Sequence, residues 1–308
     1  MNERSTIYWS SFALYETCPQ KFLWSRGWDG VDCGGGPGKP KPLTEKPSPR
    51  HHAVMGTVIQ YAIERMYNDE LYKEPQTLSA TLLAIVDREW ERQELDPRNA
   101  MDYREMELTR SEMMQHCRDA VVGYLKTMKA HRFLGPYAKA EVGLVGWVDQ
   151  YTQVGGRADV IIRRDDTGLT ILDGKNTKRK DPDPDQLRWY ALLFKLSYKE
   201  VPDRIGFVWY RFPFNEESGE SGVDWVPFNE ADLEGLAQRV IQARLNMRKG
   251  KFDPTPTPPT CKYCDYEDVC EARRTQREFN AARRKPKGDS EPPKHATGSD
   301  GFGDLTFS

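Results

Sequence analysis

Two neighbouring segments of this sequence set an acid beside a run of β-branched residues: Gly155-Gly156-Arg157-Ala158-Asp159-Val160-Ile161-Ile162 and Leu169-Thr170-Ile171-Leu172-Asp173-Gly174-Lys175. β-Branched residues favour strands, and the intervening Asp166-Thr167-Gly168 is a turn signal. The two segments therefore predict a β-hairpin that brings Asp159 close to Asp173 and Lys175.

Two carboxylates and one lysine are the side chains that metal-assisted hydrolysis of a phosphodiester needs. Carboxylate oxygens hold Mg²⁺ or Mn²⁺, the ion lowers the pKa of a bound water, and the lysine steadies charge or orients that water. A helix predicted over residues 184–198 follows the hairpin. It carries Gln186 and Tyr190, which lie four positions apart and therefore on one face.

The composition sets wide bounds on the class of protein. The chain has 308 residues, of which 30% are charged, and a formal net charge of −2. It can hold one large domain or two smaller ones. Because the charges nearly balance, any nucleic-acid surface must be a local patch. No apolar run approaches the roughly 20 residues of a membrane helix, and the start lacks the order of a signal peptide. We expect a soluble, cytoplasmic protein.

Hydrophobic periodicity predicts the remaining elements. We expect helices over Ile7–Trp24 (with Ser10 or Ser11 as N-cap), from His51 through Met66, around Leu78–Trp90, around Met113–Met128 and over 230–248, and strands over Ala140–Val145, Ile205–Tyr210 and Val223–Val226. We expect the chain to divide into an N-terminal segment (1–28), a flexible Gly/Pro loop (29–50), a helical region (51–135), an α/β core (136–252), a cysteine segment (253–278) and a disordered tail (279–308).

An Asp, then Asp-x-Lys on the next strand, then Gln-x-x-x-Tyr on a helix resembles the PD-(D/E)xK nuclease superfamily, and within it the RecB-like exonuclease branch. The resemblance covers roughly residues 7–272 without the loop at 29–50, and it implies an αβββαβ restriction-endonuclease-like core. It implies that Asp159, Asp173 and the Gly174 carbonyl bind Mg²⁺ or Mn²⁺, that Lys175 activates water, and that Gln186 and Tyr190 position Lys175 or a DNA phosphate.

The segment Gly56-Thr57-Val58-Ile59-Gln60-Tyr61-Ala62-Ile63-Glu64 resembles the family's Gly-x-x-x-His-x-x-x-Glu helix. This sequence has Gln60 where the family has a metal-binding histidine. Either the Gln60 amide oxygen binds the metal weakly or Gln60 is an ordinary polar residue, and His51 and His52 are alternative ligands. Glu64 and Glu141 are expected next to the metal site, since relatives often carry a glutamate at the place of Glu141.

Six cysteines in a cytosolic chain indicate metal binding rather than disulfides. Cys261, Cys264 and Cys270 form a short Cys-x-x-Cys-x-x-x-x-x-Cys run that needs a fourth ligand, and zinc is the generic occupant. The resemblance instead implies a [4Fe–4S] cluster, because RecB-like and AddB-like nucleases and CRISPR-associated exonucleases carry one cysteine before the nuclease core and three after it. Cys18, in a Cys-Pro pair, is then the fourth ligand; Cys33 is the weaker alternative.

The run Lys178-Arg179-Lys180 directly follows the predicted metal strand. It either contacts DNA phosphates or is a solvated loop, and the sequence does not separate the two. The last residues, from Asp300 to Ser308, place hydrophobic residues among acids and are expected to be a solubilising tail rather than a docking peptide.

The sequence thus predicts a metal-dependent deoxyribonuclease closed by an iron–sulfur clamp, acting on single-stranded or duplex DNA ends in recombination, repair or replication. No Walker motif is present, so unwinding requires a helicase or recombination partner. The rival interpretation is a catalytically weak or inactive DNA-binding or assembly subunit that keeps the fold and the cluster. Gln60 favours that interpretation, and the complete Asp159, Asp173 and Lys175 set opposes it.

Overall fold

The structure is a computed structural model that describes residues 6–28, 50–99, 108–177, 181–262 and 264–283. Its elements are, in chain order, β1 (Ile7–Tyr8), α1 (Trp9–Thr17), α2 (Pro19–Arg26), α3 (Arg50–Asn68), η1 (Leu71–Lys73), α4 (Leu78–Leu95), η2 (Pro97–Asn99), α5 (Arg110–Ala130), β2 (Ala138–Trp147), β3 (Gln153–Arg164), β4 (Gly168–Lys175), α6 (Pro184–Tyr198), β5 (Arg204–Trp209), β6 (Val223–Val226), α7 (Glu230–Arg248), α8 (Pro258–Lys262) and α9 (Glu271–Arg283). Within the described residues, no helix is long and apolar enough to cross a membrane.

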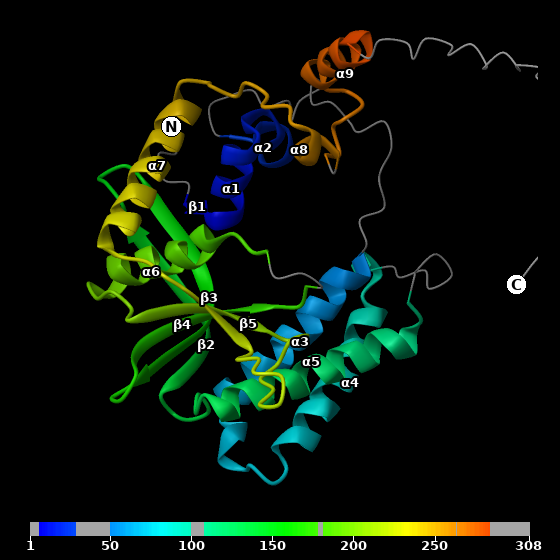
Figure 1. Cartoon of the computed structure of the whole chain (residues 1–308), viewed down its shortest axis with the longest axis vertical. Helices are drawn as coiled ribbons and strands as arrows, with labels where there is room; N and C mark the ends of the chain where they lie inside the picture. Colours follow the sequence, from blue (N-terminus) through cyan, green and yellow to red (C-terminus); the bar gives the residue numbers. More distant parts are fainter. Residues whose placement is uncertain (1–5, 29–49, 100–107, 178–180, 263, 284–308) are drawn as a thin grey trace, which may run out of the picture.

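A mixed six-stranded sheet lies at the centre of the molecule (Figure 1). Strands β2, β3 and β4 form an antiparallel meander, β5 runs parallel to β4 after the α6 crossover, and β6 closes the far edge antiparallel to β5. The long strand β3 pairs with β4 along residues 160–164 and with β1 at residues 154–155. Asp159 therefore lies where the neighbour of β3 changes.

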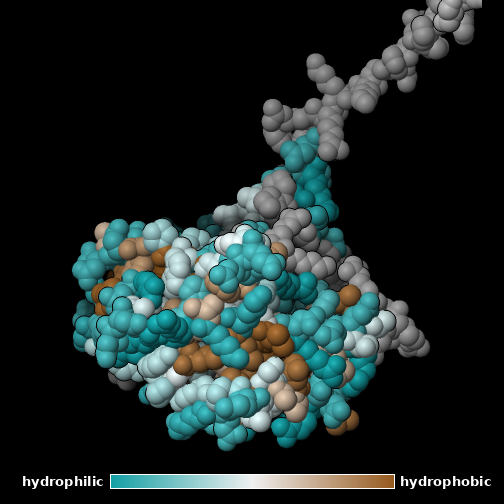
Figure 2. Space-filling view, turned by 60° about the horizontal axis from the view of Figure 1, so that its bottom comes forward, coloured by the Kyte–Doolittle hydropathy of each residue, from teal (hydrophilic) through white to brown (hydrophobic). Residues whose placement is uncertain are grey.

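Helices α3, α4 and α5 pack together on one side of the sheet (Figure 1). The predicted stripe of α3 faces this core, because its apolar residues recur every three or four positions. All of its members are buried: Val54, Val58, Ile59, Ala62, Ile63 and Met66. Figure 2 shows one face of the molecule, mostly hydrophilic, with apolar side chains gathered near its centre.

The other side of the sheet is covered by α1, α6 and α7, which share a second apolar core. Trp189 of α6 donates a hydrogen bond from Nε1 to the Gly155 carbonyl of β3, with 3.2 Å between nitrogen and oxygen. Strand β4 lies between the two cores and is apolar almost without alternation, as expected of a strand buried on both faces. Its residues Leu169 to Leu172 are at most 2% exposed.

Three hydrogen bonds join the N-terminal helices to the segment after α7, although more than 230 positions separate their partners. The Tyr15 hydroxyl donates to the Lys251 carbonyl over 2.9 Å. The Thr255 hydroxyl donates to the Thr17 carbonyl over 2.7 Å, and the Tyr266 hydroxyl to the Trp24 carbonyl over 3.1 Å. The two ends of the described chain are therefore packed together by ordinary side-chain contacts.

Most of the predicted elements are confirmed, and the sequence β2, β3, β4, α6, β5 has the order expected of an αβββαβ core. The hairpin, the helix over 184–198, the strand over 223–226 and the helix over 230–248 lie where they were expected. The calls on the loop at 29–49, including Cys33, on Lys178-Arg179-Lys180 and on residues 284–308 lie outside the described residues.

The single helix predicted over Ile7–Trp24 is wrong in two respects. Ile7 and Tyr8 form a strand, and the helix then breaks at Cys18, whose backbone is extended with φ −161° and ψ 103°. Proline disfavours helical geometry in the residue before it, and Pro19 follows Cys18. The N-cap is Tyr8 rather than Ser10 or Ser11, and it makes no side-chain capping bond.

The structure predicts a difference between two threonine N-caps. Thr109 begins α5 with a capping box, in which its hydroxyl accepts from the Glu112 amide and the Glu112 carboxylate accepts from the Thr109 amide. Thr77 occupies the same position in α4 without a side-chain capping bond. Thr109→Ala should lower the free energy of unfolding by about 1 kcal/mol in urea denaturation, and Thr77→Ala should lower it less. Equal losses would contradict this assignment.

Candidate active site

The predicted hairpin brings the two aspartates together on adjacent strands. Asp159 of β3 accepts a hydrogen bond at Oδ2 from the Gly174 backbone amide over 2.8 Å. Asp173 of β4 is 2% exposed, and its Oδ1 accepts from the Gln186 side-chain amide over 3.0 Å. The other oxygen of Asp173, Oδ2, is buried and lies 2.6 Å from the Lys175 ammonium nitrogen. The pair thus presents carboxylate oxygen at a site shielded from water.

This environment disfavours two negative charges. Burial, and then the charge of Asp173, raises the pKa of Asp159 from 3.8 to about 8. Burial also raises the pKa of Asp173, although Lys175 acts in the opposite direction. A divalent cation would compensate both carboxylates at once, so the donor set fits Mg²⁺ or Mn²⁺.

Lys175 is held beside the aspartates by the first turn of α6. Its ammonium nitrogen lies 2.6 Å from Asp173 Oδ2 and donates to Gln186 Oε1 over 2.8 Å. Gln186 therefore bridges Asp173 and Lys175, with its amide nitrogen on one and its amide oxygen on the other. Asp183 caps this helix by accepting from the Asp185 amide, and Pro184 occupies the first turn, where its missing N–H costs nothing.

Tyr190 lies one turn after Gln186 on the face of α6 that packs against the sheet. A Cβ atom on Gly156 of β3 would lie 3.3 Å from its ring, so the ring contacts the strand that carries Asp159. Burial, followed by the charges of Asp173 and Asp159, raises the pKa of Tyr190. Tyr190 is therefore neutral and near both carboxylates.

Glu141 enters the site through an unusual backbone conformation. Its φ is 53°, which is left-handed and unfavourable for a residue with a side chain. The flanking residues pair normally, Ala140 with Val160 and Val142 with Ala158, so Glu141 lies opposite Asp159. Such strain persists where surrounding contacts hold it, as at many functional sites.

Both Glu141 oxygens have partners. Gln60 donates from its amide nitrogen to Oε1, and Arg157 Nη1 lies 3.4 Å from Oε2. The structure thus brings Gln60 into the same cluster as Asp159, Asp173 and Lys175 by way of Glu141. Glu64 lies one turn after Gln60 on α3, and its carboxylate accepts a hydrogen bond from the Asn68 side chain over 3.3 Å. The rings of His51 and His52 contact each other, with centroids 4.1 Å apart, at the start of α3.

Tyr210 is a member of this cluster that sequence reasoning did not assign. Its hydroxyl donates to Gln60 Oε1 over 3.4 Å, and a Cβ atom on Gly174 would lie 1.6 Å from that hydroxyl oxygen. Only glycine therefore fits between Asp173 and Lys175. Burial, and then Asp159, Asp173 and Glu141, raises the pKa of Tyr210. The sequence placed Tyr210 at the end of a strand, but no local pattern signals that its hydroxyl reaches Gly174.

The four predicted cluster cysteines line one cavity between α2 and the C-terminal segment. Cys18, Cys261, Cys264 and Cys270 share its wall with Lys21 and Arg273. Burial raises the pKa of Cys264, with smaller contributions from Cys18 and Cys261. All four are free thiols, as is Cys117, which is fully buried in the helical core as expected.

Within the part of the chain that the structure describes, neither the carboxylate cluster nor the cysteine cavity forms a complete single-ion site. Among the described residues, no three His, Cys, Asp or Glu side chains lie close enough together to bind a metal ion. Four cysteines around one cavity supply the thiolate ligands that structural zinc and iron–sulfur clusters both use. Lys21 would offset the negative charge of these thiolates, whereas Arg273 is paired with Glu267, which lines the same cavity.

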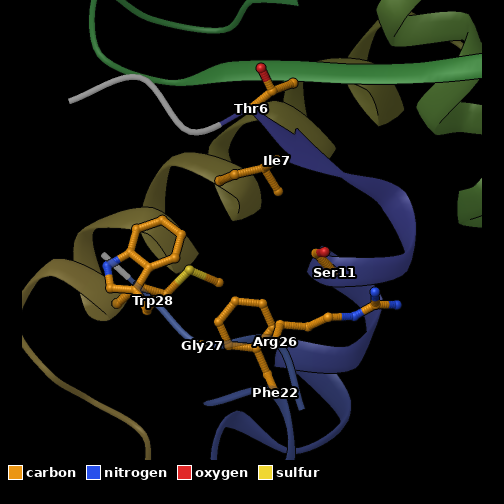
Figure 3. A pocket seen from close by; sticks show the side chains of 8 residues that line it. Thr6, Ile7, Ser11, Phe22, Arg26, Gly27 and Trp28 are labelled. Atoms are coloured by element: carbon orange, nitrogen blue, oxygen red, sulfur yellow. The ribbon is translucent and has the colours of Figure 1, made fainter. Parts of the chain in front are cut away.

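A larger cavity of about 400 Å³ lies elsewhere, between β1, the N-terminal helices and α7 (Figure 3). Phe22 and Trp28 form apolar walls, while Arg26 and Ser11 supply polar groups. None of the described residues that line it is an acid, so it is separate from the carboxylate cluster.

Comparison with known proteins agrees with this geometry. The sequence profile of the PD-(D/E)XK nuclease superfamily matches residues 9–271, a range that contains every residue of the carboxylate cluster and all four cavity cysteines. The chain belongs to this superfamily, whose members are generally nucleases that use divalent metal ions. No curated protein matches the chain.

Among solved structures, the chain is similar to one described as "Crystal structure of SSO0001". The two are 17% identical, and the match covers 72% of this chain and 97% of that one with a TM-score of 0.29.

The raised pKa of Asp159 predicts how stability depends on pH when metal is chelated. A folded-state pKa above 3.8 means that folding retains a proton which the unfolded chain releases, so stability falls as the pH rises toward 8. Between about pH 5 and about pH 8 the loss should be roughly 3 kcal/mol. Asp159→Asn should remove most of this slope in urea denaturation with EDTA. Asp166→Asn, on an exposed turn, should keep it; an unchanged slope in Asp159→Asn would refute the assignment.

Proposed function

We propose that this chain is a metal-dependent deoxyribonuclease of the RecB-like exonuclease branch that processes DNA ends in recombination, repair or replication. The observation that carries the proposal is the pair of half-buried Asp159 and buried Asp173, with Lys175 held against Asp173 by Gln186. Buried carboxylates without full compensation are costly in a purely structural role, because desolvation penalises their charge. A cation-dependent reaction explains why both are present.

Asp159, Asp173 and the Gly174 carbonyl would hold Mg²⁺ or Mn²⁺, with Glu141 beside them. When bound, the ion supplies a water of lowered pKa and stabilises charge on the phosphate. Lys175 orients the attacking water and stabilises negative charge as it develops. Gln186 fixes the Lys175 ammonium through its amide oxygen, and Tyr190 lies close enough to the carboxylates to contact a DNA phosphate. Lys178, Arg179 and Lys180, which directly follow β4, are the proposed DNA contacts beyond the metal site.

Gln60 has a different role in this arrangement from that of a histidine ligand. Its amide nitrogen is engaged by Glu141 and its amide oxygen by Tyr210. Because its amide nitrogen donates to the Glu141 carboxylate, Gln60 acts chiefly by positioning Glu141. Metal binding then depends on the two aspartates, and we expect it to be weaker than with an additional nitrogen ligand.

We also propose that Cys18, Cys261, Cys264 and Cys270 bind a [4Fe–4S] cluster that joins the N- and C-terminal segments. Support comes from their common cavity and from the three hydrogen bonds that already hold these segments together. Any unwinding of DNA would come from a helicase or recombination protein, because the sequence contains no Walker motif.

A second candidate function is a DNA-binding or assembly subunit with little or no catalysis. The substitution of glutamine at position 60, with its amide bonded to Glu141 and Tyr210, favours it. Cleavage assays on end-labelled single-stranded and duplex DNA, with and without Mn²⁺, separate the two functions.

The catalytic assignment predicts the outcome of two substitutions. Asp173→Ala removes a cation ligand, and Lys175→Ala removes the group that orients water. Each should slow metal-dependent cleavage of end-labelled DNA about a hundredfold or more. Lys195→Ala, at a half-exposed position of α6 where Lys195 pairs with Glu230, should cleave at the wild-type rate. Wild-type rates in Asp173→Ala and Lys175→Ala would reject these residues as the catalytic set.

The cysteine assignment predicts a coloured protein. Chain purified without oxygen should be brown, with broad visible absorbance and iron bound. Any single Cys→Ser change among the four cavity cysteines should bleach it and lower its melting temperature, because cluster binding contributes to folding. Cys117→Ala should retain the iron, since Cys117 lies in the helical core. A colourless protein that carries stoichiometric zinc would refute the iron assignment.

A further inference from the structure

One half of the sheet carries a row of exposed aromatic and apolar residues. Gly155 of β3 pairs with Val145 of β2 on one side and with Tyr8 of β1 on the other. Residues paired directly across strands point to the same face, as do residues two apart along a strand. Trp147 therefore joins this face from β2, two residues beyond Val145. We call this set, Tyr8, Val145 and Trp147, the aromatic face.

The aromatic face is uncovered by the described residues, whereas the opposite face is packed. On the opposite face, Cβ atoms on Gly146 and Gly156 would meet Leu196 and Leu193 of α6. On the aromatic face, a Cβ atom on Gly143 would meet no described atom within 4 Å. Tyr8 is 51% exposed, Val145 53% and Trp147 42%. These are large exposures for rings and a valine on a central sheet.

The aromatic face leads directly to the carboxylate cluster. Arg157 is the next residue of β3 on this face after Gly155, its side chain is 67% exposed, and its guanidinium lies 3.4 Å from Glu141. Asp159 follows two residues later. At about 3.3 Å per residue, the row of Tyr8 and Val145 lies roughly 13 Å along the strand from Asp159. A flexible chain lying on this face would thus reach the site without crossing another element.

We propose that the aromatic face is a stacking platform for unpaired bases of a single DNA strand on its way to the carboxylate cluster. The proposal rests on the proposed nuclease function and specifies the substrate that the site receives. Tyr8 and Trp147 offer ring faces to bases, Arg157 offers a cation to a phosphate, and the open space over Gly143 lets the strand approach the backbone closely. Paired bases of a duplex hide their ring faces and gain nothing from this surface.

The charge of the chain supports a stacking role. With a formal net charge of −2, the protein has no strong overall field to attract phosphates. Affinity for a single strand must then come from local contacts. Base stacking is one such contact, and it is available to any DNA sequence because every base has a ring face. Binding to this face should accordingly depend only weakly on salt compared with a phosphate-dominated surface.

The test is binding of a fluorescein-labelled oligothymidine, followed by anisotropy with EDTA present so that no cleavage occurs. Tyr8→Ala and Trp147→Ala should each weaken binding about tenfold. Trp147→Phe keeps a stacking ring and should bind nearly as well as wild type. Tyr198→Ala is the matched control. Tyr198 has a similar exposure of 57%, but it belongs to α6, which packs against the opposite face of the sheet. Thermal melts establish that each variant is folded.

Blunt duplex of the same length separates this face from general DNA affinity. Its binding should change less than twofold in Tyr8→Ala and Trp147→Ala. The proposal is overturned if these variants bind the single strand as tightly as wild type, or if duplex binding falls equally. If wild-type protein shows face-dependent binding of single strands but never cleaves DNA, the platform stands and the nuclease function fails. If it cleaves DNA while the substitutions leave binding unchanged, the nuclease function stands and the platform fails.

Discussion

The desolvation of two aspartates between two apolar layers is the constraint on which the rest of this structure depends. Asp159 and Asp173 lie on neighbouring strands with helices packed over both sides of the sheet. Their mutual repulsion is offset by the Gly174 amide, the Gln186 amide and Lys175. Each of these compensating groups is placed by a different feature: the hairpin register, the start of α6 and the end of β4. The fold and the electrostatics of the site are therefore inseparable.

A second set of contacts limits what the site can accommodate. The Tyr210 hydroxyl occupies the space that a side chain at position 174 would need, and it also holds Gln60. Gln60 in turn holds Glu141, whose left-handed backbone is tolerated because its carboxylate is engaged from both sides. These contacts join helix α3 to strand β2 and to Tyr210, the residue after strand β5, beside the aspartates. A change at any of the three would be transmitted to the other two through direct contact.

The N-terminal helices and the segment after α7 meet at the cysteine cavity, where hydroxyl side chains join the two segments independently of any metal. Tyr15, Thr255 and Tyr266 each donate to a backbone carbonyl of the other segment. Closing so long a loop costs conformational entropy. A disulfide or metal site that closes a loop therefore stabilises the folded state most where the loop is longest. Four thiols beside a junction of this kind are well placed to stabilise it.

The sequence by itself determined the hairpin, the α6 crossover and the order of elements, because β-branched runs, turn residues and helical periodicity are local signals. It also predicted that Asp159 lies close to Asp173 and Lys175, since their places on a hairpin follow from strand geometry. It failed at Cys18, where the proline that follows overrides helical propensity. Only the tertiary structure decided that Tyr210 reaches Gly174, that Gln60 binds Glu141, and that Tyr8, Val145 and Trp147 share one open face. These relations join residues of elements far apart in the sequence. Long-range packing and strand register set them, and no local pattern encodes either.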